Sequence, residues 1–134
     1  MSHPITMNWT NGTGNALSFA NPAAREGTDP SANPTLMRAN GTSAVSADQK
    51  GNLKAGPVGS YTWQNAADAN QFVTCNYIHP AGKGETSVTV NCSHEYQVSD
   101  NNATWGQSQT YGKDVASLQQ HAAQITLYIR ARPA

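Results

Sequence analysis

The chain has 134 residues, of which only 12% are charged, and its formal net charge at pH 7 is zero. A chain without net positive charge has no long-range attraction for phosphate. Its composition therefore argues against a nucleic-acid partner and against recruitment to anionic lipid by charge alone. The length fits one domain, and we expect residues 1–134 to form a single folded unit.

The first part of the chain carries a two-residue alternation of apolar and polar side chains. Apolar residues at every second position from Ile5 to Trp9 predict a half-buried strand. The Gly-rich run 11–14, followed by renewed alternation from Leu17, predicts a hairpin. Residues 21–34 hold three prolines and few apolar side chains, so they predict a long surface loop.

The middle of the chain contains the strongest strand signals. Residues 36–49 predict a weak pair of strands around the Asn40-Gly41 turn. Residues 60–64 alternate like a half-buried strand. Residues 71–78 are apolar on both faces, as a central strand would be.

The C-terminal part adds further short strands. Residues 86–91 alternate, and 96–98 continue the pattern. The polar, Gly-containing stretch 99–114 predicts a loop, 115–124 one short helical turn, and 125–129 a closing strand. Short strands separated by turn residues predict an all-β fold, a sandwich or a barrel, and we take the antiparallel β-sandwich as our prediction.

Motifs of enzymes and metal sites are absent from the sequence. It has no G-x-S-x-G elbow, no P-loop, no Rossmann glycine run and no H-E-x-x-H. No two of the four histidines have zinc-type spacing, and no cysteine pair accompanies them. We therefore predict no catalytic residue, no metal, no cofactor and no enzymatic activity.

Two cysteines flank the turn predicted near residues 80–84. In a symmetric hairpin Cys75 and Cys92 would lie opposite each other, which suggests a disulfide. Opposed Cβ atoms lie ~4.5–5.5 Å apart, slightly far for such a bond. The alternative is two buried thiols. The first ten residues favour it, because they lack the basic and apolar regions of a signal peptide, so we expect synthesis in the cytoplasm.

The aromatic side chains are the candidate binding residues. Trp63 and Tyr77 lie in strand-like stretches, whereas Trp105 and Tyr111 lie in a polar, Gly-rich segment. An exposed aromatic ring on a loop can anchor a lipid headgroup, a sugar or a protein. The alternative for the two loop residues is that they fold back over the edge of the sandwich. We take these four residues as the candidate membrane- or ligand-binding set.

Several motifs, taken in order, resemble the aegerolysin-like family, in particular the small component of bacterial binary insecticidal toxins. They are a strand, an Asn-Gly-Thr-Gly turn and a strand over 5–19, the run Gly-Ser-Tyr-Thr-Trp at 59–63, Pro-Ala-Gly at 80–82, and the closing strand 124–129. The segments 21–34 and 106–122 look longer than is usual in that family. The tryptophans with which fungal members recognise sphingolipid have no residue-by-residue match, so no lipid site is carried over.

The resemblance implies a compact β-sandwich of aegerolysin/actinoporin type that docks on a target-cell membrane by a lipid or a receptor. It also implies a larger partner protein with which the chain permeabilises cells, and self-association is a further option. We therefore expect the membrane-recognising small component of a binary pore-forming toxin, insecticidal or cytolytic, released to act at the target membrane. Two alternatives stay open: a carbohydrate-binding lectin of β-sandwich fold, and a hydrolase whose site carries no known motif.

Overall fold

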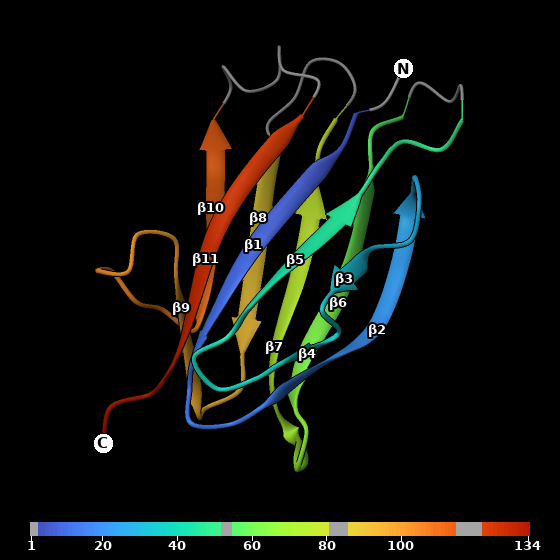
Figure 1. The fold of residues 1–134 in the computed structure, drawn as a ribbon. Coiled ribbons are helices and arrows are strands. Elements are labelled where there is room, and N and C mark those ends of the chain that lie inside the picture. The colour runs from blue at the N-terminus through green and yellow to red at the C-terminus, as the bar shows by residue number, and fades with distance from the viewer. Residues whose placement is uncertain (1–2, 52–54, 81–85, 115–121) are drawn as a thin grey trace.

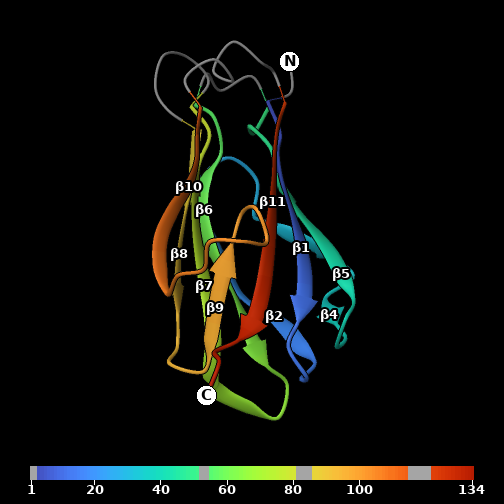
Figure 2. The ribbon, with the colours of Figure 1, turned by 90° about the vertical axis from the view of Figure 1, so that its left-hand side faces the viewer.

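The computed structural model describes residues 3–51, 55–80, 86–114 and 122–134, and each regular element in these ranges is a β-strand. The strands form two sheets that pack face to face (Figure 1; Figure 2). The described residues contain no helix long and apolar enough to cross a membrane. The all-β sandwich predicted from the alternation is confirmed.

One sheet has five strands in the order β3-β5-β1-β11-β9. Their bounds are Ser31–Asn33 (β3), Thr42–Ala47 (β5), Ile5–Gly12 (β1), Ala123–Ala131 (β11) and Tyr96–Ser99 (β9). β1 and β11 run parallel, and the other pairs of this sheet are antiparallel. The first and the last strand of the chain therefore lie side by side at its centre.

The second sheet has six strands in the order β10-β8-β7-β6-β2-β4, all paired antiparallel. Their bounds are Ser108–Asp114 (β10), Thr86–Cys92 (β8), Asp68–Ile78 (β7), Val58–Asn65 (β6), Leu17–Glu26 (β2) and Leu36–Met37 (β4). β10 and β2 thus lie at opposite edges of the sandwich (Figure 1).

The core fills the space between the sheets with the apolar half of each alternation. Aromatic side chains form its centre, and polar contacts join the two sheets there. The indole Nε1 of Trp9, on β1, donates a hydrogen bond of 2.7 Å to the hydroxyl of Tyr61, on β6. That hydroxyl in turn donates to the sulfur of Met7, 3.2 Å away. Burying each such side chain contributes roughly 1.5–3 kcal/mol.

The predicted hairpin between the first two strands is wrong, because β1 and β2 belong to different sheets. The fully buried Asn11 directs the chain from one sheet to the other. Its Oδ1 accepts a hydrogen bond of 3.0 Å from the backbone of Thr13, and its Nδ2 donates to the carbonyl oxygens of Asn15 and Met37. The Asn-Gly signal thus marks a turn but does not decide which strands pair.

Three further predictions are corrected at the sheet edges. The expected loop 21–34 contains the end of β2 and all of β3, and the expected loop 99–114 contains β10. The expected strand pair in 36–49 is divided between the two sheets. β2 is bulged and is flanked by β4 only at its start, and such edge strands tolerate proline and polar residues. Of the predicted helical turn, 115–121 lies outside the described residues, and 123–124 begin β11.

Candidate functional site

The two strand aromatics that the sequence proposed as binding residues are buried. Trp63 and Tyr77 both have 0% exposure and face the interior between the sheets. Neither presents its ring to a membrane in this structure, which argues against both as direct membrane contacts. The alternation predicts this outcome, since both share a sheet face with apolar neighbours.

The two aromatic residues that the sequence placed in a loop, Trp105 and Tyr111, lie at the β9–β10 edge and contact other residues of the protein. The Tyr111 hydroxyl donates a hydrogen bond of 2.8 Å to the carbonyl oxygen of Val98. Trp105 is half-buried, with the guanidinium carbon of Arg130 4.4 Å from its ring centroid. Arg130 also donates two hydrogen bonds, of 3.0 and 2.8 Å, to the side-chain oxygen of Gln97. These five residues, the closed corner, correspond to the alternative in which the loop folds back over the sandwich.

Both cysteines are free thiols, so the disulfide proposed from the sequence is absent. The expected register is wrong by two residues, because Cys75 lies opposite Val90 and Cys92 lies opposite Val73. Burial raises the pKa of each thiol to about 12. Both are therefore protonated at neutral pH and are poor nucleophiles and metal ligands.

Histidine and acidic side chains form no metal cluster in the ranges that the structure describes. Two imidazole rings do meet where β1 begins and β7 ends. His3 and His79 stack with ring centroids 3.9 Å apart and planes 7° apart. His79 Nδ1 lies 2.7 Å from the hydroxyl of Thr86, and His3 Nε2 lies 2.7 Å from the carbonyl oxygen of Pro80. These contacts join the two sheets, so we assign the His3–His79 pair a structural role.

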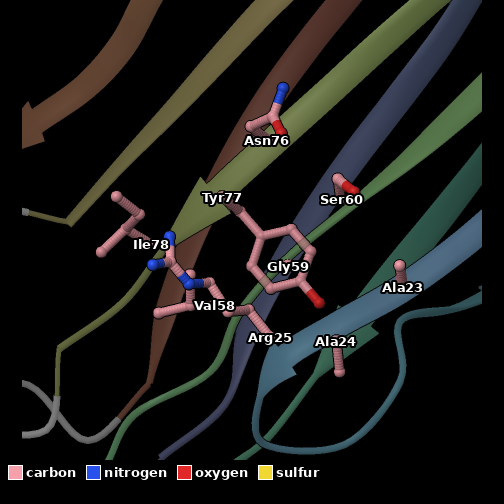
Figure 3. A pocket seen from close by; sticks show the side chains of 9 residues that line it. All are labelled: Ala23, Ala24, Arg25, Val58, Gly59, Ser60, Asn76, Tyr77 and Ile78. Carbon is pink, nitrogen blue, oxygen red and sulfur yellow. The ribbon is translucent and has the colours of Figure 1, made fainter.

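An open hollow of about 320 Å³ lies where β2, β6 and β7 run side by side (Figure 3). We call it the β2–β6–β7 hollow. Each strand contributes three consecutive residues to it. The lining residues are Ala23, Ala24, Arg25, Val58, Gly59, Ser60, Asn76, Tyr77 and Ile78.

Local backbone features create this hollow. The pairing of β2 with β6 is irregular between Ala20 and Ala23 and again between Ala24 and Glu26. Such bulges bend a strand and redirect its side chains. A Cβ atom on Gly59 would lie 2.4 Å from the Tyr77 hydroxyl and 2.5 Å from the carbonyl oxygen of Ala23. Glycine at this position therefore leaves room for the phenol that forms the floor of the hollow.

The rim of the hollow combines apolar surface with a cation. Ile78 is 45% exposed, and Leu36 is the other exposed large apolar side chain in the described part of the chain. Arg25 runs past Val58 toward Ile78 in Figure 3. Its guanidinium makes no hydrogen bond or ion pair with any residue that the structure describes. An apolar side chain and an unpaired guanidinium are thus exposed together.

The floor of the hollow carries an unsatisfied donor. The Tyr77 hydroxyl is buried and has no hydrogen-bond partner among the described residues. Figure 3 shows its ring lying across Gly59, with the oxygen directed toward Ala23 and Ala24. Burial, with smaller contributions from Cys75 and Asp29, raises the pKa of Tyr77, so the hydroxyl keeps its proton. An unpaired buried donor costs about 1–3 kcal/mol, and such groups call for a functional explanation.

The lining of the hollow determines the chemistry that it can offer. Its lining includes no carboxylate, histidine or cysteine, so it offers no pair of groups for acid–base or nucleophilic catalysis. It does offer hydrogen-bond donors beside apolar surface. Sequence reasoning named Tyr77 for another reason and missed Arg25 and Ile78, because Arg25 lay in a predicted loop and Ile78 in a strand expected to be buried on both faces.

Comparison with known proteins supports the fold. No family model matches the chain, and no curated protein matches its sequence. The structure resembles the RahU protein, solved in complex with a TRIS molecule, with TM-score 0.62 and 15% identity over 98% of this chain and 97% of that one. It also resembles IP-1A from Alcaligenes faecalis, with TM-score 0.63 and 7% identity over 98% and 92% of the two chains.

A third similar structure is that of the lipid binding protein Nakanori, with TM-score 0.56 and 12% identity over 96% of this chain and 69% of that one. At these identities the likeness concerns the fold alone. The chain shares the β-sandwich fold of these proteins, and the sandwich predicted from the sequence is confirmed.

Proposed function

We propose that this protein recognises a membrane by binding lipid in the β2–β6–β7 hollow, as the small component of a two-protein pore-forming toxin. One observation carries the proposal: the hollow places exposed Ile78 beside hydrogen-bonding groups and an unpaired Arg25. A lipid at a bilayer surface offers the same combination of apolar and polar groups. A protein of similar fold, Nakanori, is described as lipid binding, which supports this choice.

Apolar insertion would supply much of the binding free energy. Ile78 is 45% exposed in the free protein. Burying a side chain of this kind in a bilayer contributes about 1.5–3 kcal/mol when it is removed from water completely. Apolar contact is not screened by salt, so membrane binding should persist at high ionic strength.

The larger partner and the toxin role rest on the family resemblance. Small aegerolysin-like components act with a larger protein, and the present chain would supply recognition while the partner permeabilises the membrane. Insecticidal or cytolytic action should therefore require both proteins. Leakage of dye from vesicles by this chain alone would contradict the division of roles.

Vesicle co-sedimentation tests lipid recognition directly. The protein is mixed with vesicles at low and at high salt. One set of vesicles is phosphatidylcholine alone, and the others are phosphatidylcholine with phosphatidylethanolamine, with phosphatidic acid, or with both sphingomyelin and cholesterol. We expect at least one composition to bind, and Ile78→Asn to weaken that binding about 10-fold, in keeping with the loss of one buried apolar side chain. Leu36→Asn is the matched control, since Leu36 is 42% exposed and lies outside the hollow, in a separate pocket beside Arg38. Absence of binding to all of these vesicle compositions would refute the proposal.

A second candidate function, a carbohydrate-binding lectin, is favoured by the outer face of the six-stranded sheet. Hydroxyl and amide side chains follow one another across its strands, with hydrogen bonds of 3.0 Å between Thr89 and Thr110 and 2.7 Å from Ser108 to Asn91. Uncharged groups of this kind suit a neutral sugar. A glycan array that gave one sharp preference, inhibited by the free sugar, would favour the lectin over the lipid-binding protein.

A further inference from the structure

The arginines of the described chain differ in what their guanidinium groups contact. Arg130 is held by Gln97 and Trp105, and Arg132 donates to the side-chain oxygen of Gln107 at 3.2 Å. Arg25 and Arg38 have no such partner within the ranges that the structure describes, and of the two it is Arg25 that lines the hollow. A planar guanidinium binds phosphate through two parallel hydrogen bonds, which are among the strongest in proteins. Arg25 is therefore available to an anionic group.

The composition of the lining also indicates the charge of the ligand. Its charged side chain is Arg25, and it contains no carboxylate that could pair with an ammonium group. A quaternary ammonium group could instead be held by exposed aromatic faces. The aromatic side chain of the lining, Tyr77, is fully buried. The lining thus holds no partner for the positive end of a zwitterionic headgroup, and the Asp29 carboxylate beside it already accepts a hydrogen bond of 3.1 Å from the backbone N–H of Ala24.

The remaining polar groups suit a ligand rich in acceptor oxygens. Ser60 and Asn76 line the hollow and can donate hydrogen bonds. The Tyr77 hydroxyl is a buried donor without a partner, directed toward the bulged part of β2 (Figure 3). Phosphate presents several oxygens and can accept from Ser60 and Asn76 at once, whereas the Tyr77 hydroxyl is buried beneath them in this structure.

From these observations we propose that the hollow binds the phosphate group of an anionic phospholipid. Arg25 pairs with the phosphate oxygens, and Ser60 and Asn76 donate to the same anion. Val58 and the half-exposed Ile78 contact the glycerol and the start of the acyl chains, which is why the ligand is a lipid and not a free phosphate. This inference rests on the proposed function, since it names the class of lipid that the hollow recognises.

The test compares phosphatidylcholine vesicles with and without phosphatidic acid. We expect phosphatidic acid to increase binding by about 10-fold or more, and Arg25→Gln to remove that increase, as for a charge-assisted hydrogen bond. Arg25→Lys should retain part of the increase, because a lysine keeps the charge but loses the planar fork. Arg38→Gln is the matched control, since Arg38 is exposed, has no side-chain partner in the described ranges and lies outside the hollow.

Each other outcome has a defined meaning. Equal binding to vesicles with and without phosphatidic acid would overturn this inference but leave membrane recognition standing. An equal loss in Arg25→Gln and Arg38→Gln would also overturn it, because the effect would then be one of general charge. Competition by glycerol phosphate as strong as that of vesicles would show that the ligand is a soluble phosphate. Absence of binding to all vesicles would refute the proposed function itself.

Discussion

The closed corner and the β2–β6–β7 hollow each hold a buried tyrosine and an arginine, but in different states. At the closed corner, the Tyr111 hydroxyl donates to Val98, and Arg130 is fixed by Gln97 and Trp105. At the β2–β6–β7 hollow, the Tyr77 hydroxyl and the Arg25 guanidinium have no partners among the residues described.

This difference separates structural residues from residues available to a ligand. A hydrogen-bonding group whose partners lie within the protein contributes to stability, and its removal should reduce the free energy of unfolding. A group without partners contributes little to stability, and its removal should affect binding instead. Residue type alone does not distinguish the closed corner from the β2–β6–β7 hollow, whereas the hydrogen-bond partners of these residues do.

The largest expected effect tests whether the Tyr77 ring is structural even though its hydroxyl is unpaired. Tyr77→Ala should lower the free energy of unfolding by about 3–5 kcal/mol, because it removes a fully buried aromatic side chain and leaves a cavity. Urea denaturation measures the change. Ile78→Ala, at the exposed neighbouring position, should stay within about 0.5 kcal/mol. Similar small losses in both variants would contradict the assignment of the ring to the core.

Alkaline pH should lower the free energy of unfolding, because buried thiol and phenol groups occur throughout the core, including the closed corner. Burial raises the pKa of Cys75 from 9.0 to about 12 and that of Tyr111 from 10.0 to about 12. The native state then keeps protons that the unfolded state releases, so stability is complete below pH 9 and falls as pH rises toward 12. Cys75 alone accounts for up to about 1.4 kcal/mol per pH unit in that window.

Urea denaturation at pH 8 and at pH 11 measures this dependence. Cys75→Ala should show a smaller decrease between the two pH values than the unchanged protein. A decrease of the same size in both proteins would mean that the Cys75 thiol does not remain protonated in the native state.

The close packing at the floor of the hollow is tested by Gly59→Ala. The new Cβ would meet the Tyr77 hydroxyl and the Ala23 carbonyl oxygen at less than van der Waals distance. We expect a loss of about 2 kcal/mol in the free energy of unfolding, measured by thermal denaturation. Gly14→Ala is the control, because no heavy atom lies within 4 Å of its Cβ position. A neutral Gly59→Ala would indicate that the floor is not closely packed.

A direct comparison of the two phenols removes only their hydroxyl groups. Tyr111→Phe should cost about 1 kcal/mol, because its hydrogen bond to Val98 is lost. Tyr77→Phe should be neutral or slightly stabilising, because its hydroxyl has no partner to lose. The urea midpoints of the two variants measure this difference. Equal losses of stability would contradict the distinction between the closed corner and the hollow.

The smallest expected effect concerns the two arginines. Arg130→Gln should lower stability by about 0.5–1 kcal/mol, because it loses its contact with the Trp105 ring and its hydrogen bonds to Gln97. Arg25→Gln should change it by less than about 0.3 kcal/mol, as is usual for an exposed residue without partners. Differential thermal unfolding of both variants measures the contrast. A larger loss in Arg25→Gln would mean that Arg25 is structural.

The sequence by itself determined the strands that have one buried and one solvated face. The alternations at 5–9, 86–90 and 125–129 are strands in the structure, with their apolar residues inside. This is possible because the two-residue period is a local property: it depends on the side chains of a segment and not on which strand lies beside it. The all-β class follows from the same signal.

Only the tertiary structure decided which strands pair and which polar groups keep free hydrogen-bonding capacity. β10 and the second half of β2 border the six-stranded sheet, and exposed polar residues there leave no alternation to read. The parallel contact of β1 with β11 joins the two ends of the chain, which no local pattern encodes. Whether an arginine or a tyrosine is paired depends on neighbours distant in sequence. For this reason Tyr77 could be proposed from the sequence, but the lack of a partner for its hydroxyl could not. Arg25 and Ile78 were not proposed from the sequence at all.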